Sequence, residues 1–398
     1  METELMCKNK SIAKLDRETG IAHVKSPELM PLNLDFRETC HSLSDNLHNL
    51  QAFDNWCADR VISIDRKYAK QILNTLGLSQ SQSIADKAEI ARSYRCLSLQ
   101  DAFWIRSIHE SIEWEDVNLF TNSFSNAMVP VSLLGGSITL TNRYLNEGYP
   151  DLSTNGTYAK AWMRRNNEIF LFKADDTYES DETLREVGAS QILDAFDIPH
   201  VQYWMDHFDN LRVAACKCMT NENTSIVPFR HFRLFCERNH CDPIEEIKKV
   251  DPDGYYRMNI ATYLIGNTDN HDGNWGLYRD NNTGQFLGIH PLFDFNNAFY
   301  GYAFENGGNC IPEMTIIKHG LNELFDWTYE PTKSQQEAAI EAIQHVTIEA
   351  KSSVMRSSFL NDNDCDEFCA RCNRLGIAIE VVEDRNYFDR LFEEDYER

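Results

Sequence analysis

The sequence is poor in positive charge. Its 398 residues include 38 Lys and Arg against 62 Asp and Glu, so the formal net charge is −24. Proteins that grip a phosphate backbone do so with clustered Lys and Arg, and this composition therefore argues against nucleic-acid binding as the main task. Apolar residues at 42% and charged residues at 25% are ordinary globular values, which excludes wholesale disorder. A chain of this length is expected to form two or three compact units.

Segments that would target the chain to a membrane are also missing. Residues 1–34 carry scattered charges and contain no apolar core of signal-peptide length. The stretch from Val117 to Asn142 has no charge, but its many Asn, Ser and Thr residues make it too polar for hydrocarbon. There is no polybasic run for a membrane surface either. These features predict a cytoplasmic protein without a membrane partner.

Cysteine, with 12 residues, is far too sparse for a disulfide scaffold. Cys365, Cys369 and Cys372 are spaced by four and three residues, which places them on one face of a helix expected over 364–375. No second Cys or His pair with zinc-knuckle spacing accompanies them, so a buried apolar face is favoured over a metal site. Cysteine usage thus predicts reduced thiols, in agreement with the cytoplasm.

In the N-terminal third, the sequence pattern changes from one typical of strands to one typical of helices, and there are no repeats or low-complexity linkers. Residues 1–34 are expected to be rich in strands, whereas residues 35–115 show helical periodicity, including a helical run over 97–108. Residues 69–92 resemble a helix-turn-helix, and residues 60–96 contain seven basic against three acidic side chains. A plain helical subdomain with solvated charges is favoured here, and direct nucleic-acid binding is not expected.

From about residue 150 the pattern changes to short strands and turns. The runs 156–164 and 169–174 flank a polar turn and predict a hairpin. A helix that ends before Pro199 and two further strands, over 201–205 and 211–218, follow. Beyond Pro228 the chain is expected to be mostly helical, apart from a second hairpin near residue 280. Strands first and helices later, with one helix inserted among the strands, predict an α+β fold with two lobes.

The second hairpin carries the most informative residues. Because it folds the chain back so that positions summing to about 565 face one another, Asp294 is expected close to Asn274. An amide oxygen and a carboxylate brought together are hard ligands that suit Mg²⁺ shared with phosphates. Asp269, five residues before Asn274, lies at the near side of the same loop, where it can accept a hydroxyl proton.

An Asp, an Asn five residues later and an Asp at the foot of a hairpin form the phosphoryl-transfer arrangement of protein kinases. Asp294-Phe295-Asn296 stands where many kinases have Asp-Phe-Gly. The context Asn267-Thr268-Asp269-Asn270-His271, with Pro291-Leu292-Phe293 before Asp294, resembles the HipA-like serine/threonine kinases. These are bacterial proteins, often encoded as toxins beside a DNA-binding antitoxin. A similar loop occurs in phosphoinositide lipid kinases.

Upstream residues fit the same order of parts. Lys173, in an otherwise apolar strand, is either the exposed end of that strand or the cation that pairs with the α- and β-phosphates. Glu186, on the inserted helix, is the candidate ion-pair partner of Lys173, with Glu182 as the competing one. A small-residue loop before the first hairpin has backbone N–H groups that could cover nucleotide phosphates, an ordinary turn being the alternative. That loop is Ser153-Thr154-Asn155-Gly156-Thr157.

The resemblance implies a two-lobed protein-kinase-like fold with a helical N-terminal extension and a mostly helical C-terminal lobe. It divides the chain into a strand-rich leader with a helical subdomain (1–145), a nucleotide-binding N-lobe (146–220) and a helical C-lobe with the catalytic loop (221–398). Asp269, Asn274, Asp294 and Lys173 would be catalytic, Asn274 and Asp294 holding the metal. The nucleotide would be bound by Ser153, Thr154, Asn155, Gly156, Lys173 and Glu186, and its adenine by backbone groups of Cys218 and Met219.

The function implied is transfer of a phosphoryl group from ATP, with Mg²⁺, to Ser or Thr of a protein substrate. A hydroxyl of the 153–157 loop is a candidate for inhibitory autophosphorylation, because added negative charge would eject the loop from the phosphate site. An antitoxin-like partner is a further implication. The alternatives are a small-molecule or lipid kinase on the same fold and a catalytically silent nucleotide-binding module.

Overall fold

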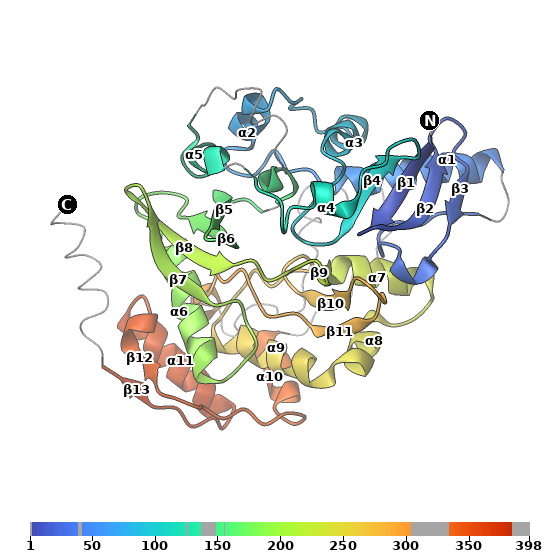
Figure 1. The fold of residues 1–398 in the computed structure, drawn as a ribbon. Coiled ribbons are helices and arrows are strands. Elements are labelled where there is room, and N and C mark those ends of the chain that lie inside the picture. The colour runs from blue at the N-terminus through green and yellow to red at the C-terminus, as the bar shows by residue number, and fades with distance from the viewer. Residues whose placement is uncertain are drawn as a thin grey trace.

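The computed structural model describes residues 2–38, 42–124, 126–136, 149–154, 156–303 and 334–383. The fold is a mixture of helices and strands with several antiparallel sheets (Figure 1). Among the described residues, no helix has the length and apolar character needed to cross a membrane. The division into three domains at 145 and 220 stays a prediction.

The N-terminal part is built on an antiparallel sheet of order β3-β2-β1-β4, beside which helix α1 lies (Figure 1). Its elements are β1 (Glu2–Cys7), β2 (Lys10–Asp16), β3 (Ala22–Val24), α1 (Leu43–Ala58), α2 (Ala69–Thr75), α3 (Ile84–Ser93), β4 (Phe103–Ser107), α4 (Trp114–Val117) and α5 (Val129–Leu134). Strands at the start and helices after them confirm that part of the expectation, and one apolar cluster joins the sheet to α1, α2 and α3.

The helical run expected over 97–108 is wrong, because its second half is strand β4. Strand β4 pairs antiparallel with β1, and Trp104 lies opposite Met6. Phe103, Trp104 and Ile105 are all buried, so apolar spacing along this run does not distinguish a helix from a strand. The pairing partner lies about a hundred residues away, and it decides the conformation.

The central sheet has the order β5-β6-β8-β7 and carries the inserted helix α6. Its elements are β5 (Lys160–Arg165), β6 (Glu168–Ala174), α6 (Glu182–Ala195), β7 (Tyr203–Phe208) and β8 (Leu211–Lys217). The hairpin β5–β6, the helix and both later strands confirm the sequence expectation. Lys160 lies directly opposite Lys173 in the β5–β6 register, so the hairpin brings two lysines side by side.

The C-terminal part combines a three-stranded sheet, β11-β10-β9, with helices (Figure 1). Its elements are β9 (Thr224–Pro228), α7 (Phe229–Arg238), α8 (Pro243–Val250), α9 (Pro252–Leu264), β10 (Gly276–Asp280), β11 (Phe286–Ile289), α10 (Gln335–Ala342), β12 (Val354–Met355), α11 (Asp362–Arg374) and β13 (Val381–Val382). In the hairpin β10–β11, Leu277 lies opposite Ile289, one position from the expected register. Helix α11 confirms the helix expected over 364–375, and its Cys365 and Cys372 are buried free thiols.

Candidate active site

The site is organised around the ammonium group of Lys173, which points inward from β6. Lys173 Nζ lies 2.6 Å from Glu186 Oε1 and 2.7 Å from Asp294 Oδ1. The Tyr203 hydroxyl is a further contact at 3.3 Å. The Lys173 side chain is only 7% exposed, so it is not the solvent-facing end of its strand. Glu182, the competing candidate, instead accepts a hydrogen bond from the backbone N–H of Asp176.

Three elements far apart in sequence meet at this ammonium. Strand β6 supplies Lys173, helix α6 supplies Glu186, and the segment after β11 supplies Asp294. The backbone of Asp294 is left-handed, with φ of 65°, a conformation that Asp tolerates better than most residues. The next residue, buried Phe295, donates its backbone N–H to Glu186 Oε1 at 3.0 Å. Glu186 therefore binds both the Lys173 ammonium and the Asp294–Phe295 backbone.

The opposite charges of Lys173 and Asp294 stabilise each other's charged form. Burial raises the pKa of the Asp294 carboxyl, but the positive charges of Lys173 and Lys160 outweigh burial and hold that pKa well below its ordinary value. Burial likewise lowers the pKa of Lys173, and the carboxylates of Asp294 and Glu186 outweigh it and raise the pKa. The pKa of Glu186 is raised, chiefly by burial. Lys173 and Asp294 are thus held charged in an almost dry environment.

The catalytic-loop residues lie on the segment between α9 and β10. The Asn274 side-chain N–H group donates to the backbone oxygen of Asp269 at 2.8 Å, which leaves the Asn274 amide oxygen as an acceptor. Asp269 Oδ2 accepts a hydrogen bond from Asn297 at 3.2 Å. Burial, followed by the negative charge of Asp294, raises the pKa of the Asp269 carboxyl. A raised pKa makes Asp269 a better proton acceptor than an exposed aspartate.

Side-chain hydrogen bonds fasten this loop to the Asp294 segment. The Asn267 amide donates to the backbone oxygen of Asp294 at 3.2 Å. His271 Nδ1 accepts the backbone N–H of Gly273 at 3.0 Å, so this histidine braces the loop from within. The arrangement places Asp269, Asn274 and Asp294 on two segments that are tied together.

The oxygen donors of the site fit a magnesium ion held jointly with phosphates. Asp294 offers a carboxylate and Asn274 an amide oxygen, both hard ligands. Among the described residues, no group of three or more His, Cys, Asp or Glu side chains gathers into an all-protein metal site. Mg²⁺ commonly takes one or two protein ligands and completes its shell with substrate phosphates and water. The donor set therefore suits Mg²⁺.

Only part of the small-residue loop, residues 153–157, contacts the residues of this site. The hydroxyls of Ser153 and Thr154 both donate to the backbone oxygen of Pro150, at 3.1 and 2.9 Å, and both residues are buried. Gly156 has a φ of 109°, and a Cβ there would overlap the ammonium of Lys160. Thr157 is exposed. Asn155 lies outside the described residues.

Two cations of the site were not predicted from the sequence. Lys160 is buried, and burial lowers the pKa of its ammonium to about 8, although the Asp294 carboxylate opposes this shift. Arg66, from the segment before α2, is buried as well and donates to the backbone oxygens of Thr154 and Lys160. A lysine within the apolar run 158–163 was the available signal for Lys160. Arg66 had no local signal.

The segment expected to meet adenine follows β8. The backbone N–H of Cys218 donates to Ile169 at 2.8 Å, and the Tyr278 hydroxyl donates to the Met219 oxygen at 2.6 Å. Tyr278, on β10, therefore fixes the backbone of this connection between the central and C-terminal sheets. The Cys218 amide is already engaged within the chain, whereas a carbonyl such as that of Met219 can accept a second hydrogen bond.

Comparisons with known proteins give distant similarities. The chain is 24% identical over 160 residues to the serine/threonine-protein kinase CtkA of Helicobacter pylori (strain J99), an alignment that covers 35% of this chain and 49% of CtkA. The chain thus matches about half the length of this curated relative. No protein-family model matches.

Two solved structures are also similar. The crystal structure of H. pylori CtkA has a TM-score of 0.37 and 16% identity, covering 55% of this chain and 88% of CtkA. The HipA–HipB–operator DNA complex of the Shewanella oneidensis MR-1 toxin–antitoxin system has a TM-score of 0.49 and 10% identity, covering 94% of this chain and 95% of the matched chain.

Proposed function

We propose that this chain transfers the γ-phosphoryl group of ATP to a Ser or Thr hydroxyl of a protein, in a reaction that depends on Mg²⁺. Its sequence similarity to CtkA supports a HipA-like kinase family. The observation that carries the proposal is the buried contact of Lys173 with both Glu186 and Asp294, whose backbone Asn267 ties to the loop that bears Asp269 and Asn274. Phosphoryl transfer needs positioned charges of this kind more than covalent chemistry.

Each residue has a role in the proposed reaction. Lys173, with Lys160 beside it, binds the phosphate oxygens, and Glu186 keeps Lys173 in place. Asp294 and Asn274 would hold Mg²⁺, which neutralises phosphate charge. Asp269 accepts the proton of the acceptor hydroxyl. The new bond joins that oxygen to the γ-phosphorus as the bond from the γ-phosphorus to the bridging oxygen breaks, and ADP leaves.

The finer features belong to the same proposal. Residues 146–220 would form the nucleotide-binding lobe, and the backbone near Cys218 and Met219 would contact adenine. A hydroxyl in the 153–157 loop would be the site of inhibitory autophosphorylation. A second protein of antitoxin type would be the partner, because HipA of S. oneidensis forms a complex with HipB.

The test is incubation of the purified chain with γ-labelled ATP and Mg²⁺, beside the variants Asp269→Asn and Asp294→Asn. We expect label on the wild-type protein, or on added basic proteins, and at least about a hundredfold less with either variant. A circular dichroism melt shows whether the variants fold. Wild-type rates in a folded Asp269→Asn protein would contradict the assigned base, and transfer to small alcohols alone would point to a small-molecule kinase.

A further inference from the structure

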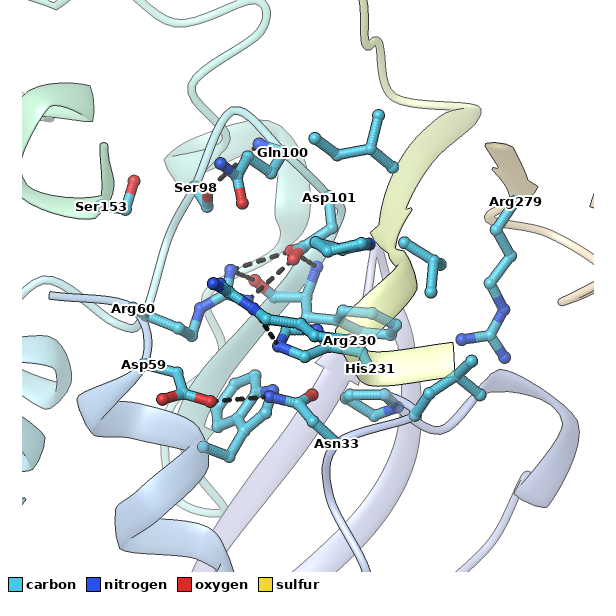
Figure 2. A pocket seen from close by; sticks show the side chains of 17 residues that line it. Asn33, Asp59, Arg60, Ser98, Gln100, Asp101, Ser153, Arg230, His231 and Arg279 are labelled. Atoms are coloured by element: carbon cyan, nitrogen blue, oxygen red, sulfur yellow. Dashed lines mark hydrogen bonds and ion pairs between the residues drawn. The ribbon is translucent and has the colours of Figure 1, made fainter. Parts of the chain in front are cut away.

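A polar pocket lies between the N-terminal part and helix α7, and Lys173, Glu186 and Asp294 are not among the residues that line it (Figure 2). Its cavity volume is about 50 Å³, so it suits a small group rather than a large ligand. Three arginines line it, Arg60, Arg230 and Arg279, against the two aspartates Asp59 and Asp101. In a chain with a net charge of −24, a pocket with an excess of positive charge stands out.

Among the described residues, Arg230 is the arginine of this pocket without a carboxylate in direct contact; the nearest counter-charge, Asp272, acts on it through space and pairs directly with Arg233. Arg60 is neutralised by a double hydrogen bond to Asp101, both contacts at 2.8 Å. The Arg279 guanidinium donates hydrogen bonds to backbone oxygens, including that of Met30 at 2.8 Å. Arg230 donates its Nε to His231 Nε2 at 3.3 Å, and within the described residues its two Nη groups have no carboxylate or other acceptor.

Neutral donors accompany this guanidinium. An arginine can only donate, so His231 Nε2 must accept and the ring proton lies on Nδ1. Burial, with the charges of Arg230 and Arg60, lowers the pKa of His231 to about 3, which keeps the ring neutral. The side chains of Gln100 and Ser98 line the same pocket, and Figure 2 shows them above Arg60 and Asp101. An oxyanion with several oxygens matches such a group of donors.

We propose that this pocket binds a phosphate-bearing group, with Arg230 as its main anchor and His231 and Gln100 as further donors. Guanidinium groups bind phosphate through paired N–H donors. There are two sources for the group. One is a free phosphate or phosphate ester, and the other is the chain itself, because Ser153 lines one edge of the pocket. The second source rests on the proposed kinase function, whereas the first does not.

The position of the pocket suggests a regulatory role. The backbone N–H of Arg230 donates to the backbone oxygen of Asp272, in the catalytic loop, at 3.0 Å. Three residues on, Arg233 forms an ion pair with Asp272 at 2.8 Å. An anion that fixes the Arg230 side chain therefore acts on the segment that bears Asp269 and Asn274.

The test uses the His231 ring as a local probe, in protein with ¹⁵N-labelled histidine and without ATP. Inorganic phosphate is titrated into the full chain, and His231→Gln identifies the resonance. We expect a saturable shift of the His231 signal, with affinity at least about tenfold weaker in Arg230→Gln. The control Arg257→Gln removes a partly exposed arginine, paired with Asp253 and absent from the pocket lining, and should bind phosphate like the wild type. No saturable shift in the wild type, or an equal one in Arg230→Gln, would overturn the proposal.

A second arm separates the two sources. Wild type and Ser153→Ala are incubated with ATP and Mg²⁺ and then freed of nucleotide. If Ser153 phosphate is the ligand, the treated wild type shows the His231 shift without added phosphate and Ser153→Ala does not. If the ligand is a free anion, both proteins still respond to added phosphate. A chain without kinase activity would also respond to phosphate, so failure of the kinase proposal and failure of the pocket proposal give different results.

Discussion

Lys160 is a single residue whose proposed role in phosphate binding lowers the stability of the folded protein. Its ammonium is buried beside a second lysine, and burial lowers its pKa from 10.5 to about 8. Because the folded pKa is below the unfolded one, the unfolded chain binds more protons between pH 8 and 10.5. The charged lysine therefore costs the folded state its full penalty below about pH 8, and this penalty disappears as the pH rises toward 10.5.

We therefore expect Lys160→Met to stabilise the fold at pH 7 by about 1–3 kcal/mol, and to weaken ATP binding. The gain should shrink when unfolding in denaturant is repeated at pH 10. Lys217→Met is the matched control, since Lys217 is exposed and its ion pair with Glu168 lies at the surface. If Lys160→Met is less stable than the wild type at pH 7, burial of the Lys160 ammonium does not destabilise the folded state.

At the scale of elements, α6 sets the position of Glu186 by close packing. Gly188, one half-turn further on, lies against the backbone oxygen of Ser358, and a Cβ at Gly188 would overlap that oxygen. Backbone cannot move aside as a flexible side chain does, so an added methyl group must displace the helix. The helix has to retain this glycine if Glu186 is to reach Lys173.

We expect Gly188→Ala to lower the free energy of unfolding by about 1–3 kcal/mol and to reduce phosphoryl transfer, because α6 shifts away from β6. Thermal melts and the labelled-ATP assay measure both. Gly136→Ala is the control, since its added Cβ would meet its nearest atom, the Pro130 oxygen, at an ordinary 3.5 Å. Unchanged activity in Gly188→Ala would show that α6 does not hold Glu186 through this contact.

The elements that were predictable from the sequence are those whose evidence is local. Polar turns between apolar runs mark the hairpins β5–β6 and β10–β11. Lys173 and Glu186 are only thirteen residues apart, at the end of a strand and in the helix that follows it, so their pairing is also local in sequence. Strand β4 was missed because β1, almost a hundred residues earlier, decides its conformation. Arg66 was missed for the same reason, since its acceptors Thr154 and Lys160 lie some ninety residues away.

At the scale of the whole molecule, partly buried hydrogen bonds join the N-terminal part to the sheet of β9, β10 and β11, which lies below it in Figure 1. The guanidinium of Arg279, on β10, donates to the backbone oxygens of Met30 and Glu28 at 2.8 and 2.5 Å, and to that of Gly284 at 3.0 Å. Trp114 adds a hydrogen bond to Glu222 at 2.8 Å. The same junction forms one wall of the pocket proposed to bind phosphate, so the two parts must stay together for that site to exist.

Arg279→Ala should therefore loosen this junction, because it leaves three partly buried backbone oxygens without their donor, a loss of about 1–3 kcal/mol. Calorimetry should then show the N-terminal part unfolding at a lower temperature than it does in the wild type, separately from the rest of the chain. Gly284→Ala attacks the junction independently, since Gly284 has a φ of 78° and a Cβ there would overlap the Glu28 oxygen. Arg257→Ala, at an exposed ion pair, should melt like the wild type. A single transition at the wild-type temperature in both Arg279→Ala and Gly284→Ala would show that the N-terminal sheet is held elsewhere, and the phosphate pocket would then not depend on this contact.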